Sequence, residues 1–459
     1  MDALWRRSAV ELAAALRNRE VSAREVLGAH LARIAETDPA INAIVTLEPE
    51  RALAQATAAD EALARGEPVG PLHGLPTAHK DLADTAGVRT TYGSPIYAEH
   101  VPERDEPFVV RVREAGAVML GKTNTPEFGA GSHTFNPVFG PTRNPHDLSK
   151  SAGGSSGGAA AALASGMVPI ADGSDLGGSL RNPASFCGVV GFRPSVGLVA
   201  SWPDADPEDL SVDGPMARTV EDAALLLSVM ADRPDLAVVA SQAAELDGLR
   251  VAWAPACAAT MPVDPEIVSV VDAARPRFEA LGCRVAPAYP DLTGAREVFF
   301  TLRAQSFATE YGPLLTQHRS RIKETVLWNI ELGLALTGDD VARAHALAAD
   351  IRDRAAAFFD SFDVLVQPVA QVAPFPIETE YPTEVAGVAM ATYIDWMESC
   401  WSITVLGGPA ISVPCGRTAT GLPIGLQIVG PRGDDAAVLR LARAFEQTGP
   451  PATIAPLAG

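Results

Sequence analysis

Glycine is concentrated in one segment of the chain. Eleven of the 39 glycines lie within the 45 residues from Gly153 to Gly197, although the whole chain has 459 residues. Glycine has no Cβ, so it tolerates positive φ and lets another backbone or a ligand approach closely. The segment is therefore compatible with a flexible linker, with a phosphate-binding loop, or with a packed site built from tight turns.

Composition and charge exclude several classes of protein. With 47% apolar and 20% charged residues the chain can bury a large core. The net charge of -20 argues against binding to a phosphate backbone. Five scattered cysteines without a CxxC pair indicate neither a disulfide framework nor a zinc site. Because no signal peptide or membrane-spanning segment is evident, we expect a soluble cytoplasmic protein.

Hydrophobic periodicity predicts an α/β fold. Helical patterns, with Ser8 and Ser22 as N-caps, alternate with short apolar runs that are typical of strands. We expect helices over 48–65, 107–115, 156–165, from about 179, 265–281 and 434–447. The expected strands are 76–81, 117–120, 168–171, 249–253, 283–288, 364–367, 411–414 and 422–429. Polar, proline-rich segments at 202–213 and 373–390 are expected to be surface loops at the border of a pocket. The loops at 202–213 and 373–400 are the candidates for substrate specificity.

The simplest domain organisation is a single domain over residues 1–459. Within it we distinguish an N-terminal helical segment over 1–66 and a core over 71–200 that contains the glycine-rich motifs. A helical excursion is expected over 290–362. No internal repeat and no linker long enough to force a domain boundary is visible.

The stretch from Gly116 to Thr123 matches the phosphate-loop expression G-x-x-x-x-G-K-[ST]. A phosphate loop needs a strand before its first glycine and a helix after its threonine. Here a helical pattern over 109–115 precedes Gly116, the residues between are apolar and strand-like, and Pro126 interrupts any following helix. These features argue against a nucleotide site.

The stretch from Gly154 to Gly158 matches the nucleophile elbow G-x-S-x-G, with Ser156 as the nucleophile. That motif needs an apolar strand leading into it and a histidine downstream. The preceding residues 145–151 are polar and turn-like, and His318 and His345 fall in amphipathic helical stretches. A Ser156-elbow esterase therefore remains an alternative.

The same glycine-rich region offers a second arrangement of serines. Residues 153–158 place Ser155 in a backbone nearly free of β-carbons, and residues 173–183 place Ser179 at the start of a helix. Uncapped N–H groups at a helix start bind anions. The backbone amides that would converge there as an oxyanion hole beside a nucleophile are those of Leu176, Gly177, Gly178 and Ser179.

Lys80 is the candidate base for these serines, because no nearby histidine suggests one. It ends an apolar run in which an ammonium group would be poorly solvated. Burial lowers a lysine pKa from about 10.4 toward neutrality, and a neutral lysine can accept a serine proton. Considered alone, Lys80 would more simply extend its ammonium group to water.

Together these motifs resemble the signature of the amidase signature family, the Ser-cis-Ser-Lys amide hydrolases. The spacings of 75 residues from Lys80 to Ser155 and 24 from Ser155 to Ser179 fit that family. The resemblance extends over residues 8–447 and implies a large mixed β-sheet flanked by helices on both faces. Further stretches similar to family blocks are 121–124, 136–140, 186–191, 214–222 and 421–427.

The resemblance also implies roles for these residues. Ser179 would be the nucleophile, and Ser155, after a cis peptide bond, would hydrogen-bond Ser179 and relay its proton to neutral Lys80. The amides of residues 176–179 would hold the oxyanion, and water would release the acyl-enzyme. Gly129 aligns with a position whose backbone faces the substrate.

Three further residues match family positions, and we interpret them as buried polar scaffold: Ser156, Asp175 and Arg181. The family resemblance implies neither a cofactor nor a metal. The expected partner is a small-molecule amide or carbamate, with no nucleic acid and no membrane. Whether the chain forms a homodimer is left open by the sequence.

The substrate is less constrained by the resemblance. Residues 195–203 depart from the tRNA-dependent amidotransferase branch, which more often carries a Tyr-Gly pair and an Arg/Ser-rich turn here. We therefore favour a free-standing hydrolase, with an amidotransferase-type subunit without independent turnover as the alternative. Aryl or hydrophobic amides, anilides, carbamates (urethanes) or esters would suit an apolar pocket. Its candidate aromatic residues are Phe128, Phe135, Trp202, Trp328, Trp396 and Trp401.

Overall fold

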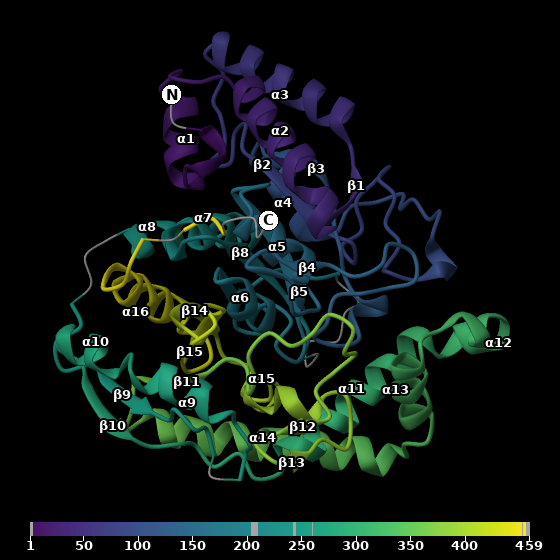
Figure 1. Cartoon of the computed structure of the whole chain (residues 1–459), viewed down its shortest axis with the longest axis vertical. Coiled ribbons are helices and arrows are strands. Elements are labelled where there is room, and N and C mark those ends of the chain that lie inside the picture. The colour runs from purple at the N-terminus through teal and green to yellow at the C-terminus, as the bar shows by residue number, and fades with distance from the viewer. Residues whose placement is uncertain (1–2, 203–209, 242–244, 259, 452, 456–459) are drawn as a thin grey trace.

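A computed structural model of the chain describes residues 3–202, 210–241, 245–258, 260–451 and 453–455. One mixed sheet of eleven strands runs through them, in the order β1-β3-β2-β6-β8-β7-β14-β15-β11-β9-β10 (Figure 1). The strands are β1 Ile44–Leu47, β2 Pro76–Lys80, β3 Val118–Thr123, β6 Ile170–Asp175, β7 Val190–Arg193, β8 Val212–Ala217, β9 Arg250–Trp253, β10 Arg284–Pro287, β11 Val364–Pro368, β14 Ala410–Arg417 and β15 Pro423–Val429. The mixed α/β architecture predicted from the sequence is confirmed.

The helices were mostly anticipated from their periodicity. They are α1 Ala9–Arg17, α2 Ala23–Ile41, α3 Pro49–Ala64, α4 Pro107–Glu114, α5 Gly157–Ala164, α6 Arg181–Cys187, α7 Val220–Met230, α8 Asp235–Ser241, α9 Pro265–Asp272, α10 Arg275–Ala280, α11 Ala295–Tyr311, α12 Leu315–His318, α13 Glu324–Leu334, α14 Gly338–Phe359, α15 Glu398–Thr404 and α16 Asp435–Gln447. Ser8 and Ser22 are N-caps as predicted, and each forms a capping box. Among the described residues, no helix combines the length and apolar character needed to cross a membrane.

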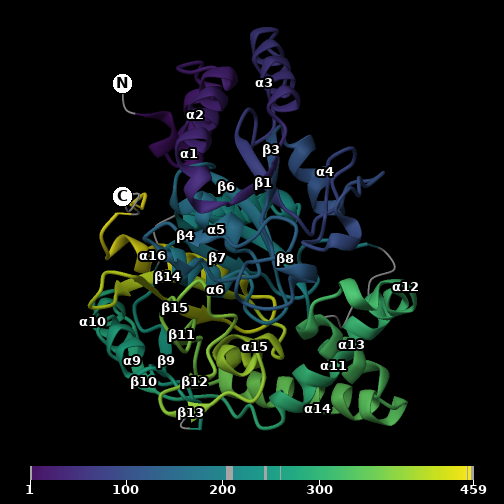
Figure 2. The same cartoon turned by 45° about the vertical axis from the view of Figure 1, so that its right-hand side comes forward.

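Both faces of the central strands are covered. Every residue of β2, β3, β11 and β15 is buried, the pattern of a sheet with packed layers on each side. Figure 1 and Figure 2 show α1 to α3 gathered at one end of the molecule and α11 to α14 at the other. The second group lies within the helical excursion expected over 290–362.

Some sequence expectations were wrong in detail. The single helix predicted over 265–281 is divided into α9 and α10, because Pro276 lies in the first turn of α10 and cannot continue a helix. The polar lead-in at 145–151 forms a hairpin of β4 Arg143–Asn144 and β5 Asp147–Ser151. The predicted loop over 202–213 ends in β8, and its residues 203–209 lie outside the described structure.

Two of the clustered glycines are required by close packing around the site. A Cβ at Gly158 would overlap the backbone of Asn124, which follows β3, and one at Gly173 would overlap the side chain of Ser156. Only glycine allows α5 and β6 to approach their neighbours so closely. The glycine-rich segment is therefore a compact packing element and not a linker.

Candidate active site

Lys80 lies at the end of β2 and reaches both glycine-rich motifs. Its side chain is 1% exposed, and its Nζ donates to Ser155 Oγ at 2.7 Å and to Ser174 Oγ at 2.9 Å. The peptide bond between Gly154 and Ser155 is cis. Ser155 from the turn before α5 and Ser174 from β6 are thus held at one buried amine.

The environment of Lys80 favours its neutral form. Burial lowers the pKa of the Lys80 amine from 10.5 to about 7, although the carboxylates of Asp213, Asp175 and Asp172 oppose this shift. Asp172 accepts from His79 Nδ1 at 2.5 Å and from the Lys80 backbone N–H at 3.0 Å. An amine with a pKa near 7 can act as a base at neutral pH.

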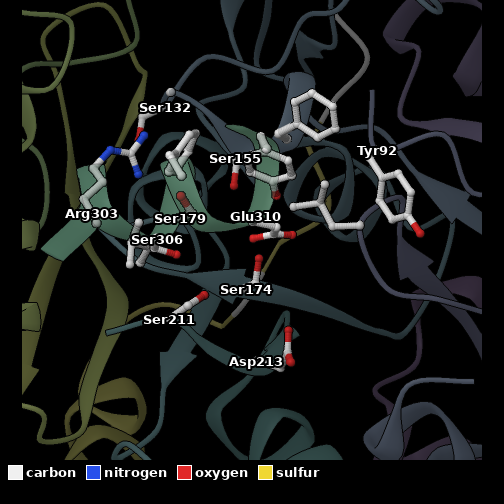
Figure 3. Close-up of a pocket in the computed structure, with 18 of the residues that line it drawn as sticks. Tyr92, Ser132, Ser155, Ser174, Ser179, Ser211, Asp213, Arg303, Ser306 and Glu310 are labelled. Carbon is white, nitrogen blue, oxygen red and sulfur yellow. The ribbon is translucent and has the colours of Figure 1, made fainter. Parts of the chain in front are cut away.

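Ser179 shares a cavity with Ser155 (Figure 3). The two loops are joined through the backbone, since the Ser156 N–H donates to the Ser179 carbonyl at 3.2 Å. No hydrogen bond joins the hydroxyls of Ser155 and Ser179 within the described structure. The structure therefore brings all three residues of the expected relay to one place, but only the Lys80–Ser155 contact is already formed.

The four backbone amides predicted to form an oxyanion hole differ in availability. The Gly178 N–H donates to Asp175 Oδ1 at 2.7 Å, so that donor is already engaged. Within the described residues, the N–H groups of Leu176, Gly177 and Ser179 have no protein acceptor. We accordingly leave Gly178 out of the candidate oxyanion hole, because its amide stabilises the turn instead.

Asp175 and Arg181 form a buried ion pair beneath this turn. Arg181 Nε lies 3.0 Å from Asp175 Oδ2, both side chains are fully buried, and Arg193 lies 3.5 Å from the same carboxylate. Burial by itself would raise the pKa of Asp175, but the two guanidinium groups hold it below its ordinary value. These contacts agree with the scaffold role inferred for Asp175 and Arg181.

The cavity beside Ser179 has a volume of about 600 Å³. Of the six candidate aromatic residues, Phe128 and Trp202 line it; Trp396 and Trp401 are instead buried in the core, because they pack against Phe186 and Phe299. Phe135 and Trp328 do not line it either. Sequence reasoning missed its other aromatic lining residues, which are Tyr92, Tyr97, Phe299, Phe307 and Tyr311.

Gly129 also lines the cavity, where it adopts a φ of +68°. A Cβ at this position would lie only 3.0 Å from Leu82 Cδ1 and in ordinary contact, at 3.5 Å, with Ser155 Oγ, so Leu82 would have to shift. The two candidate specificity loops both reach the cavity, 202–213 through Trp202, Ser211 and Asp213 and 373–400 through Ile394 and Met397. No residue of the proline-rich part 373–390 lines it, in contrast to our expectation.

Ser174 and Asp213 are two of the polar lining residues that sequence reasoning did not identify. They lie opposite one another in the antiparallel pair of β6 and β8, and both line the cavity. Ser174 precedes Asp175 in a strand, so the two side chains point to opposite faces. From that alternation the sequence could have predicted that Ser174 faces the site. Its pairing with Asp213 could not be predicted, because it depends on the fold.

The competing motifs are not supported by the structure. Ser156 is buried and its Oγ donates to the Ser174 carbonyl at 3.4 Å, while His318 and His345 lie in α12 and α14 and do not line the cavity. Lys122 is in β3 with its Nζ donating to Thr85 Oγ1 at 2.9 Å. The stretch 116–123 is therefore a short turn after α4 followed by β3, and not a phosphate loop.

Comparisons with known proteins identify the family of the chain. The family model described as Amidase matches residues 25–439. The chain is 37% identical to an acylamidase of Rhodococcus erythropolis, over 96% of this chain and 95% of that protein. It is 36% identical to a glutamyl-tRNA(Gln) amidotransferase subunit of Methylococcus capsulatus, over 97% of each. The chain belongs to the amidase family.

Solved structures show the same relationship. A bacterial aryl acylamidase of the amidase signature enzymes superposes with a TM-score of 0.88 at 29% identity, over 97% of this chain and 96% of that one. The 6-aminohexanoate cyclic dimer hydrolase superposes with a TM-score of 0.86 at 29% identity, over 98% of each chain. The chain is thus an enzyme of the amidase signature family.

Proposed function

We propose that this amidase cleaves the C–N bond of small hydrophobic or aryl amides through an acyl-enzyme on Ser179. The observation that carries the proposal is the buried contact of 2.7 Å between Lys80 Nζ and Ser155 Oγ, beside Ser179 in the cavity. The acylamidase and aryl acylamidase relatives support amides and anilides as substrates. Carbamates (urethanes) and esters present a similar acyl carbon and are further candidates.

In the proposed mechanism Ser179 Oγ attacks the acyl carbon while its proton passes to Ser155, whose own proton passes to neutral Lys80. The oxyanion accepts hydrogen bonds from the N–H groups of Leu176, Gly177 and Ser179. When the C–N bond breaks, Lys80 returns the proton through Ser155 to the leaving nitrogen. Water then attacks the ester on Ser179, and the same residues carry its proton as the acid is released.

The pH dependence of hydrolysis tests the role of Lys80. Because the amine must be neutral and its pKa is about 7, kcat/KM should fall as pH falls through 7, by about tenfold per unit on the acid side. Glu106 also lines the cavity, and burial raises its pKa to about 7. The pH profile of Glu106→Gln should retain the fall in kcat/KM on the acid side. If that fall disappeared in the variant, the titrating group would be Glu106 and not Lys80.

A partner-dependent amidotransferase component is the second candidate, favoured by the identity with the Methylococcus capsulatus protein over nearly the full chain. Treating the lone purified chain with a fluorophosphonate and mapping the adduct by mass spectrometry distinguishes the candidates. We expect labelling at Ser179 and none in Ser179→Ala. An unlabelled chain would favour the partner-dependent component, and an adduct on Ser156 would favour the elbow esterase.

A further inference from the structure

One face of α11 lines the cavity. Phe299, Arg303, Phe307 and Glu310 recur every three or four residues along this helix and all contribute to the lining. Arg303 supplies the only guanidinium or ammonium group among the described lining residues. Its side chain is 5% exposed, so a permanent positive charge is buried at the wall of the substrate cavity.

The Arg303 side chain is held firmly but incompletely paired. Its Nη2 donates to Tyr393 Oη at 2.6 Å, and Asn329 Nδ2 donates to the same oxygen at 2.6 Å. The guanidinium carbon lies 4.4 Å from the centre of the Phe307 ring. Its Nη1 has no acceptor among the described residues and is not enclosed, whereas its Nε also lacks an acceptor but is fully enclosed. No carboxylate of the described residues forms an ion pair with Arg303.

Burying a guanidinium group without a counter-charge is costly, so a fold retains one mainly where something else completes its hydrogen bonds. A guanidinium group has five N–H donors and no acceptor, and it matches carboxylate and carbonyl oxygens. In Figure 3 the guanidinium group of Arg303 points toward Ser132 and the interior of the cavity. An oxygen acceptor on a bound molecule would therefore complete its pairing.

The four acidic residues of the described lining, which are Asp84, Glu106, Asp213 and Glu310, form no ion pair with Arg303. Asp84 accepts a hydrogen bond of 2.5 Å from Tyr92 Oη, and Figure 3 shows Tyr92 on the opposite side of the view from Arg303. Glu310 lies seven residues along α11, which is two helical turns or about 10 Å. Arg303 and Glu310 thus line the cavity from the same helix without forming an ion pair with each other.

We propose that Arg303 binds a carboxylate or carbonyl oxygen of the substrate other than the scissile carbonyl. The preferred substrates are then amides that carry a second acceptor oxygen on the acyl or the amine side. This inference rests on the proposed function, because it assigns a substrate feature to the cavity beside Ser179. Arg303 acts in recognition and takes no part in the proton relay.

The test compares matched substrate pairs. On the acyl side the pair is succinyl and pentanoyl 4-nitroanilide; on the amine side it is 4-acetamidobenzoate and 4-methylacetanilide. In Arg303→Met, kcat/KM for the carboxylate member of one pair should fall about 10- to 100-fold, the loss expected for a charge-assisted hydrogen bond. The neutral member should change less than about twofold. Arg303→Lys, which keeps the charge without the planar fork, should lie between.

Equal losses for both members of each pair, or no loss for any, would overturn the proposal, since a merely structural role does not distinguish them. Tyr393→Phe removes the hydroxyl that orients Arg303 and provides a milder variant, expected to reduce the same selectivity ratio. Fluorophosphonate labelling of Ser179 in each variant separates this inference from the proposed function. Retained labelling with lost selectivity supports Arg303 as the acceptor-binding residue.

Discussion

Replacing Ser179 by alanine is expected to lower kcat by about 10,000-fold or more, because the variant has no atom that can form the acyl-enzyme. Ser179 is at the surface of the cavity and its hydroxyl makes no hydrogen bond within the described structure. The substitution should therefore leave the melting temperature nearly unchanged. Steady-state hydrolysis of a 4-nitroanilide, followed by release of nitroaniline, measures the loss.

Two other serines provide controls for this variant. Ser306 lines the same cavity from α11 and should tolerate alanine with less than about a threefold change in kcat. Ser156 is buried below the cavity, and Ser156→Ala should cost far less than Ser179→Ala. If Ser156→Ala abolished turnover while Ser179→Ala remained active, the assignment of the nucleophile would be wrong.

Replacing Lys80 by methionine should lower kcat/KM by about 1,000-fold, within the range of general-base contributions. Lys80→Arg should be almost as inactive, because a guanidinium group stays protonated and cannot accept a proton. The methionine variant should remain folded, since it removes a buried group whose charged form is penalised by desolvation. Circular dichroism and a thermal melt would verify the fold.

Lys122 provides the matched control for Lys80. It is also fully buried, and burial lowers its pKa from 10.5 to about 8, but its Nζ contacts Thr85 Oγ1 and does not line the cavity. Lys122→Met should likewise remain folded, and the enzyme should retain turnover because Lys122 contacts neither serine of the relay. Equal catalytic losses in the two variants would mean that Lys80 acts only through the structure.

Several features of this fold follow from local sequence and were predicted from it. Ser22 begins a helix because its hydroxyl and the Glu25 side chain satisfy free backbone N–H groups within four residues. Helices such as α16, and buried strands such as β15, follow from the periodicity of their own side chains. In such cases the residues that decide the structure are neighbours in the chain.

The lining of the cavity could not be predicted in the same way. Trp396 and Phe299 are both large aromatic residues, but one is in the core and the other is at the cavity wall. Which of these occurs depends on the packing of α11 against the segment near residue 394, and hydrophobicity alone does not encode that packing. Gly178 likewise matched a signature, yet its amide is engaged by Asp175.

The sequence alone was sufficient to predict the family and the candidate catalytic residues. It did so through the glycine cluster, the two serine motifs and their separation from Lys80, because short motifs reflect the turns that the backbone must make. The tertiary structure alone decided which groups meet. It placed Ser174 against Lys80 and opposite Asp213 through the pairing of β6 with β8, and it buried Arg303 beside the substrate cavity. These contacts join residues far apart in the chain, and their geometry arises only when the sheet and the helices have packed.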